Sequence, residues 1–141
     1  MFELEQEETV AEQLDLDTLT RVVFTHLHFD HAGGLALLPP SVPVVVQDRE
    51  WEAGTNAEAI GRNFFLPRDY AEAERQVVLV EGEHDLLGDG SLRLLPTPRT
   101  HPGHQSVRVG DRLVIGADVV HYASVLDDRR PPIFGDESRE F

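Results

Sequence analysis

The sequence concentrates side chains that bind metal ions in the stretch 25–34, which reads THLHFDHAGG. Within six positions it holds three histidines, His26, His28 and His31, and the carboxyl group of Asp30. Neutral imidazoles and carboxylates are the ligands that zinc and iron take in proteins. A solvated polar loop is the alternative interpretation, but such loops rarely contain so many histidines. The stretch therefore predicts a site for a divalent metal ion.

The spacing of these ligands favours two neighbouring metal ions over one. If residues 21–25 form a strand, the ligands follow it in a tight loop, where His26 and His28 can point to one side. Asp30 and His31 can then turn toward a second point a few ångströms away. Two metals about 3.5–4 Å apart can hold a water molecule between them and lower its pKa toward neutrality. We therefore expect two divalent metal ions as the cofactor, with zinc first and iron or manganese as alternatives.

The elements around this stretch indicate layers of α and β structure. The sequence predicts a helix near 8–14, a strand at 21–25, a short helix over 32–38, a buried strand at 43–47 and a helix whose N-cap is Asp48. Strands that alternate with helices are typical of an α/β arrangement. From residue 76 onward, short apolar runs are separated by glycine-containing turns at 88–90 and 110–111. This second pattern predicts antiparallel strands.

The segment HLHFDHAGG resembles the signature of the metallo-β-lactamase superfamily and, within it, of the N-acyl homoserine lactonase branch. The flanking segments LDLDTLTRVVFTHLHFDH and VVVQDREWEA are also similar to that branch. The resemblance covers nearly all of the chain, and it implies the αββα sandwich of the superfamily. The expected fold class is therefore α/β, an α+β sandwich.

By the same resemblance, the chain covers only the middle of the family's domain. The N-terminal strands of the first sheet would be missing, and so would a C-terminal strand–helix unit with a final metal-binding histidine. We expect one partial domain over 1–141, with an α/β part at 1–75, an antiparallel β part at 76–120 and a loose tail at 121–141. Open strand edges then predict marginal stability or association with another chain, such as a homo-oligomer.

The second metal motif of the family is altered in this sequence. Residues 97–106 read TPRTHPGHQS, where the family usually has T-P-G-H-[ST]-P-G-H-Q-S. Thr100 stands at the position of the ligand histidine, and His101 follows one residue later. Three interpretations stay open: His101 binds the metal through a shifted backbone, His104 rotates into its place, or this metal position is lost.

Two further residues belong to the site that the resemblance implies. Asp118 ends the apolar run LVIGAD, where the family has an aspartate that bridges both metals. Tyr122 lies one residue beyond the family's tyrosine position, which His121 occupies here. Tyr122 is expected to polarise the substrate carbonyl or to protonate the leaving oxygen. His121 is an alternative for that role, and a half-buried structural tyrosine is the other interpretation of Tyr122.

Residues 55–75 include Phe64 and Phe65 ahead of Pro67. The resemblance implies that an insertion here helps to form a wall for an acyl chain. The alternative is a helix that docks both rings into the core. We favour the core, because nothing in the sequence turns these rings toward a cleft.

The function that the resemblance implies is that of a metal-dependent hydrolase, most like N-acyl homoserine lactonases. The catalytic residues would be Asp30, which orients water, and Tyr122. A hydroxide that bridges the two metals would attack the carbonyl of a small-molecule ester or lactone. The alternatives are a catalytically inactive fragment of the same fold and a hydrolase of thioesters or phosphoesters. The expected metal ligands are His26, His28, Asp30, His31, His101 and Asp118.

Composition limits the expected partners and location. The 141 residues include 26 acidic and 12 basic side chains, which give a formal net charge of −14. Such an acidic chain argues against nucleic acid or an anionic membrane surface as a partner. The absence of cysteine excludes disulfides and thiolate metal ligands. No apolar run approaches the roughly 18 residues of a membrane span, and the acidic N-terminus does not resemble a signal peptide, so we expect a cytoplasmic protein.

Overall fold

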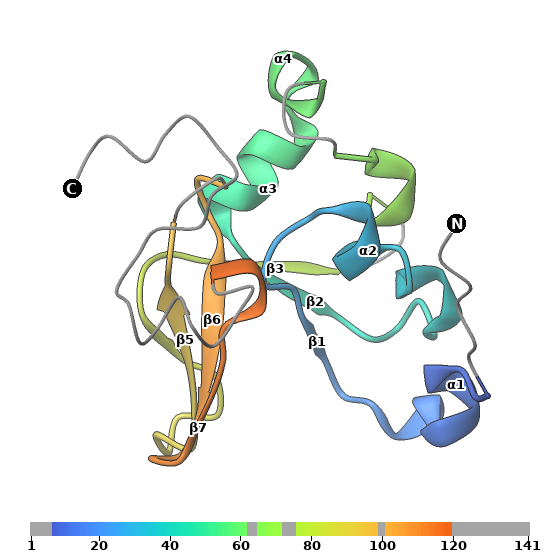
Figure 1. The fold of residues 1–141 in the computed structure, drawn as a ribbon, viewed down its shortest axis with the longest axis vertical. Helices are drawn as coiled ribbons and strands as arrows, with labels where there is room; N and C mark the ends of the chain where they lie inside the picture. The colour runs from blue at the N-terminus through green and yellow to red at the C-terminus, as the bar shows by residue number, and fades with distance from the viewer. Residues whose placement is uncertain (1–6, 62–64, 72–75, 99–100, 120–141) are drawn as a thin grey trace.

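The computed structural model describes residues 7–61, 65–71, 76–98 and 101–119. These residues form two β-sheets with short helices on one side (Figure 1). The first sheet is parallel, and its strands in spatial order are β1 (Val22–Val23), β2 (Val44–Gln47) and β3 (Val77–Val80). The second sheet is antiparallel, in the order β4 (His84–Asp85), β5 (Leu92–Pro96), β6 (Gln105–Val109) and β7 (Leu113–Ile115).

Short helices precede and connect the parallel strands. The α-helices are α1 (Val10–Gln13), α2 (Phe29–Ala32), α3 (Asp48–Thr55) and α4 (Ala57–Ile60). Single 3-10 turns occur at Leu16–Thr18, Leu35–Leu37, Pro67–Asp69 and Ala117–Val119. Within the described ranges, every helix is too short or too polar to cross a lipid bilayer.

Apolar side chains on β2 hold three layers together. Val44 and Val46 point to one face of the strand and pack into a cluster with residues of the helical side, including Phe24, Leu27 and Tyr70. Val45 points to the opposite face and packs with Val80 of β3 and Leu94 of β5. Helices therefore cover one face of the parallel sheet, and the antiparallel sheet covers the other. The expected mixed α/β fold class is confirmed.

One expectation about the sheets is wrong. The sequence pattern groups residues 76–80 with the antiparallel strands, but β3 pairs parallel with β2 over four residues. A parallel neighbour needs a long crossover connection, and the segment with α3 and α4 supplies it. The apolar run at 77–80 does not encode the direction of its pairing. The antiparallel sheet accordingly begins at His84.

Two helix boundaries also differ from the prediction. The helix expected over 32–38 is split into α2, which begins at Phe29, and a 3-10 turn, because Gly33 and Gly34 favour an interruption between them. The N-cap of α3 is Gln47 and not Asp48. The side chain of Gln47 exchanges hydrogen bonds with the backbone of Gly82, which keeps Gln47 extended.

Buried amide hydrogen bonds join the two sheets where β1 ends and β6 begins. The backbone N–H of Gln105 donates to the carbonyl of Thr25 at 2.9 Å. The side-chain Nε2 of Gln105 donates to the carbonyl of Phe24 at 2.7 Å, and its Oε1 accepts from Gln47 Nε2 at 2.9 Å. Buried polar groups that are fully paired in this way fix one register between the layers. They hold the loops that contain the histidines next to each other.

Candidate metal centre

The histidine stretch leaves β1 and enters α2. His26 is fully buried, and His28 is the N-cap residue of α2. Asp30 and His31 lie on the helix itself and not in a loop as the sequence suggested, since α2 begins at Phe29. The helix leaves the Asp30 side chain 56% exposed and that of His31 27% exposed. The stretch therefore contains a buried part and a solvent-facing part.

Three imidazoles form the first group that could hold a metal ion. The possible ligand atoms of His26, His28 and His101 all lie within 4.8 Å of one another. The ring centroids of His28 and His101 are 4.0 Å apart, and that of His26 lies 4.8 Å from that of His101. His101 reaches this point from the loop that precedes β6. His104 is outside this group, and Thr100 is outside the described residues.

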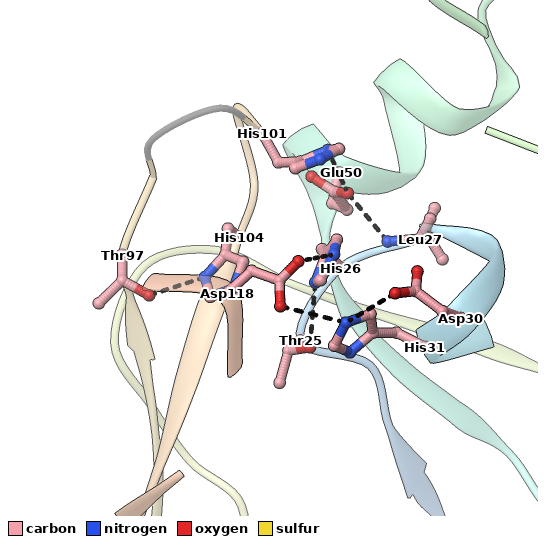
Figure 2. Close-up of polar contacts among 10 residues, drawn as sticks. All are labelled: Thr25, His26, Leu27, Asp30, His31, Glu50, Thr97, His101, His104 and Asp118. Atoms are coloured by element: carbon pink, nitrogen blue, oxygen red, sulfur yellow. Dashed lines mark hydrogen bonds and ion pairs between the residues drawn. The ribbon is translucent and has the colours of Figure 1, made fainter. Parts of the chain in front are cut away.

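A second group shares His26 with the first and adds His31 and Asp118. Asp118 Oδ2 lies 3.5 Å from His26 Nε2, and its Oδ1 lies 3.3 Å from His31 Nε2. Figure 2 shows this carboxyl group between the two imidazoles. Asp30 stands at the edge, with Oδ2 3.8 Å from His31 Nε2. The structure thus places five of the six predicted metal-binding residues in these two groups and leaves Asp30 outside both of them.

Unpaired ring nitrogens show that the cluster fits a cation. Nε2 of His26, Nδ1 of His101 and Nε2 of His104 are buried without a hydrogen-bond partner. Such atoms cost about 1–3 kcal/mol each unless something binds them. The Nδ1 atoms of His26 and His104 lie 3.2 Å from Thr25 Oγ1 and 2.9 Å from Thr97 Oγ1, respectively. Imidazole and carboxylate donors in this arrangement suit a divalent metal ion.

The protonation state of the buried histidines also suits a metal. Burial, and after it the neighbouring imidazoles of His31 and His101, lower the pKa of His26 to about 2. Burial lowers the pKa of His104 to about 4. Both rings are therefore neutral at pH 7, which is the form of imidazole that binds metal ions.

Sequence reasoning missed Glu50, whose side chain is fully buried beside the cluster. Its Oε1 accepts the backbone N–H of Leu27 at 3.0 Å, and its Oε2 accepts that of Gly103 at 3.2 Å. A signal was present: Glu50 lies three residues after Gln47 and four before Gly54, both of which are buried. An acidic residue on the inward stripe of a helix requires partners inside the protein.

The ring of Phe65 lies close to two of these imidazoles. Phe65 is a buried core residue, as expected, but it forms an isolated β-bridge with His28 and does not lie on a helix. Its ring centroid lies 5.4 Å from that of His101 and 6.2 Å from that of His28. Phe64 and both candidates for the proton donor, His121 and Tyr122, lie outside the described residues. Their predicted roles stay predictions.

Comparisons with known proteins agree with the motif and the fold. An N-acyl homoserine lactonase of Bacillus thuringiensis is 34% identical over 91 residues, which are 64% of this chain and 33% of that protein. N-acyl homoserine lactonase AttM of Rhizobium radiobacter is 30% identical over 92 residues, 62% of this chain and 35% of that protein. The chain therefore spans about a third of the length of these curated relatives.

A solved structure of similar fold is an N-acyl homoserine lactone hydrolase with the product N-hexanoyl-L-homoserine bound at its catalytic metal center. It aligns with a TM-score of 0.67 at 26% identity, and the match covers 82% of this chain and 44% of that one. The family model for the metallo-beta-lactamase superfamily matches residues 2–140. Since this match takes in almost the whole sequence, the chain belongs to the metallo-beta-lactamase superfamily.

Proposed function

We propose that this chain is part of a metal-dependent hydrolase that opens the lactone ring of N-acyl homoserine lactones. The observation that carries the proposal is the convergence of imidazoles and Asp118 in two groups of possible ligand atoms, both of which include His26, whose buried Nε2 has no hydrogen-bond partner. The substrate class is supported by the relatives, which are N-acyl homoserine lactonases. Since the chain spans only part of those proteins, both activity and substrate belong to the proposal.

The candidate ligands of this chain form two groups, one for each of two divalent ions. His26, His28 and His101 would hold the first ion, while His31 and Asp118 would contribute to the second, beside which His26 also lies. We propose zinc, with iron and manganese as alternatives for the same donors. When bound, such ions lower the pKa of a water molecule and polarise a carbonyl oxygen.

The remaining roles follow from exposure and position. Asp30 lies on the open side of the cluster, where its carboxyl group can orient the attacking water and accept its proton. The oxygen of that water adds to the lactone carbonyl carbon, and the ring C–O bond breaks. The leaving oxygen takes a proton and becomes the hydroxyl group of the ring-opened acid. Tyr122 is the proposed donor of that proton, as the resemblance implies.

The test is ring opening of N-hexanoyl homoserine lactone, followed by chromatography, together with metal content by inductively coupled plasma mass spectrometry. We expect about two metal ions per chain after dialysis, and we expect His28→Ala or Asp118→Ala to abolish ring opening. His84→Ala is the matched control, because His84 is exposed on β4 and should leave the rate unchanged.

The outcomes separate the alternatives. Unchanged turnover in His28→Ala or Asp118→Ala would falsify the assignment of these ligands. A chain that binds metal but opens no lactone would contradict the activity and indicate an inactive scaffold. Hydrolysis of thioesters or phosphoesters in place of lactones would contradict the substrate class. The cytoplasmic location and the absence of a nucleic-acid partner stay predictions.

A further inference from the structure

Helix α3 places a buried carboxyl group directly behind one imidazole of the cluster. Glu50 Oε1 lies 3.4 Å from His101 Nδ1, and the two side chains are 0% and 3% exposed. Figure 2 shows this contact on the side of His101 that faces α3. His101 Nδ1 is one of the buried nitrogens without a hydrogen-bond partner. The carboxyl group is therefore placed to accept a hydrogen bond from an Nδ1–H of His101.

Backbone contacts fix Glu50 in this position. Leu27 N–H, which donates to Oε1 at 3.0 Å, lies between His26 and His28 in the first ligand stretch. Gly103 N–H, which donates to Oε2 at 3.2 Å, lies two residues after His101. One carboxyl group thus contacts both segments that supply imidazoles.

The close approach of these segments depends on a glycine. A Cβ atom at Gly103 would lie 2.6 Å from Glu50 Cβ and still closer to the Glu50 backbone nitrogen. No other residue type could occupy position 103 without moving the loop or α3. The loop that contains His101 therefore packs directly against the first turn of α3. The position of this turn determines where the His101 ring lies.

We propose that Glu50 is a positioning residue of the metal centre, one that accepts the Nδ1–H of His101 and leaves Nε2 for the metal. The inference rests on the proposed function, since it assumes that His101 is a ligand. An acidic partner behind a ligating histidine fixes the tautomer and the ring orientation, and it makes the ligand more basic. Here it also explains how a histidine one residue beyond the family's usual position is held in the cluster.

The first experiment measures zinc affinity by competition with a chromophoric chelator. Glu50→Gln should bind Zn²⁺ about 10–100-fold more weakly than the wild type, as is typical for loss of such a partner. Glu52→Gln is the matched control, because it removes the same charge from an exposed position on the same helix. An affinity of Glu50→Gln equal to that of the wild type would overturn the proposal.

A double-mutant cycle separates positioning from mere support of the fold. If Glu50 acts through His101, Glu50→Gln should have little further effect on zinc affinity when His101 is already alanine. If Glu50 only clamps the backbone at Leu27 and Gly103, its loss should still weaken binding by His26 and His28 in that background. A full, additive effect in the double variant would therefore overturn the positioning role.

A measurement on the wild type does not depend on whether the variants fold. In the zinc-loaded protein labelled with ¹⁵N at histidine, His101 should show a proton on Nδ1 and the shift of a metal-bound nitrogen at Nε2. The reverse pattern would overturn the inference and leave the metal centre in place. A wild type that binds no zinc would contradict the proposed metal centre and this inference together.

Discussion

His26 combines three properties that a metal ligand needs. It is fully buried, its pKa is lowered to about 2 by burial and by nearby imidazoles, and its Nε2 has no hydrogen-bond partner. It is also the residue that the two groups of possible ligands share. Loss of this single ring should therefore disturb both groups, whereas loss of His28 or His31 removes a member of only one.

The structure distinguishes the two candidates for the altered second motif. Loss of a residue that hydrogen-bonds a metal ligand lowers metal affinity by about 10–100-fold. We expect His101→Ala, which removes a ligand itself, to lower zinc affinity by more than this. His104→Ala should have a smaller effect, because His104 is not in a ligand group and its Nδ1 contacts Thr97. The comparison uses the same chelator competition for both variants. A larger loss for His104→Ala would identify His104 as the ligand.

The candidate ligands were predictable to different degrees. His26, His28 and His31 are close in sequence, so their shared chemistry is visible without a fold. His101 and Asp118 could be named only through the family resemblance. The position of Glu50 on its helix indicated burial, but its partners could not be predicted, because Leu27 and Gly103 are 23 and 53 residues away. Its role exists only once the two layers are packed.

At the scale of elements, helix α3 packs closely against the core because Gly54 has no side chain. A Cβ atom at Gly54 would lie 2.5 Å from Leu27 Cδ1 and 3.0 Å from the hydroxyl of Tyr70. The Tyr70 hydroxyl donates to the carbonyl of Gly54 at 2.5 Å, and Trp51 stacks edge-on against its ring at 5.9 Å. The position of Glu50 therefore depends on how closely this helix approaches the loop after β1.

Tyr70 should make stability depend on alkaline pH. Burial, and after it the charges of Glu50 and Asp69, raise the pKa of Tyr70 from 10.0 to about 12. The unfolded chain loses this proton near pH 10, whereas the folded chain keeps it to about pH 12. The contribution of Tyr70 is thus complete below pH 10 and is lost as the pH rises from 10 to 12.

Urea unfolding of the wild type and of Tyr70→Phe tests this expectation. Below pH 10 the wild type should be more stable by about 1 kcal/mol, the net value of one hydrogen bond. The difference in the free energy of unfolding should shrink as the pH approaches 12. A difference that stays constant over this range would show that Tyr70 ionises equally in both states.

The existence of most elements could be predicted, but their pairing could not. The buried strand at 44–47 and the turns at 88–90 and 110 follow from apolar runs and from glycines, which adopt positive φ at positions 88, 90 and 110. The direction of β3 depends on the crossover and on contacts with β2. Similarly, α2 begins inside the metal motif because His28 becomes its N-cap, a feature that apolar periodicity does not reveal.

At the scale of the whole molecule, the candidate ligands come from both layers. His26, His28 and His31 follow β1 of the parallel sheet, while His101 precedes β6 and Asp118 follows β7 of the antiparallel sheet. The layers are also joined by the buried Gln47–Gln105 hydrogen bond and by packing around Val45. The predicted association with a second copy of the chain stays a prediction.

Removal of metal should therefore weaken the whole fold. A ligand that binds only the folded state adds about 2.7 kcal/mol to the free energy of unfolding at a hundredfold excess over its Kd. We expect a chelator to lower the melting temperature of the wild type and to leave that of the double variant His26→Ala/His101→Ala unchanged. Circular dichroism during heating measures both. Equal melting of the wild type with and without chelator would contradict a metal shared by the two layers.

The origin of the ligands in both layers has a consequence for the lifetime of the protein. Digestion of a marginally stable chain follows the population of its open form, and the 12 arginines of this sequence offer trypsin many cleavage sites. A metal ion that ties the layers together would reduce that population and slow digestion. Half-lives in trypsin that are equal with and without zinc would rule this out. Slower digestion in the presence of zinc would mean that copies of the chain with bound metal outlast copies without it.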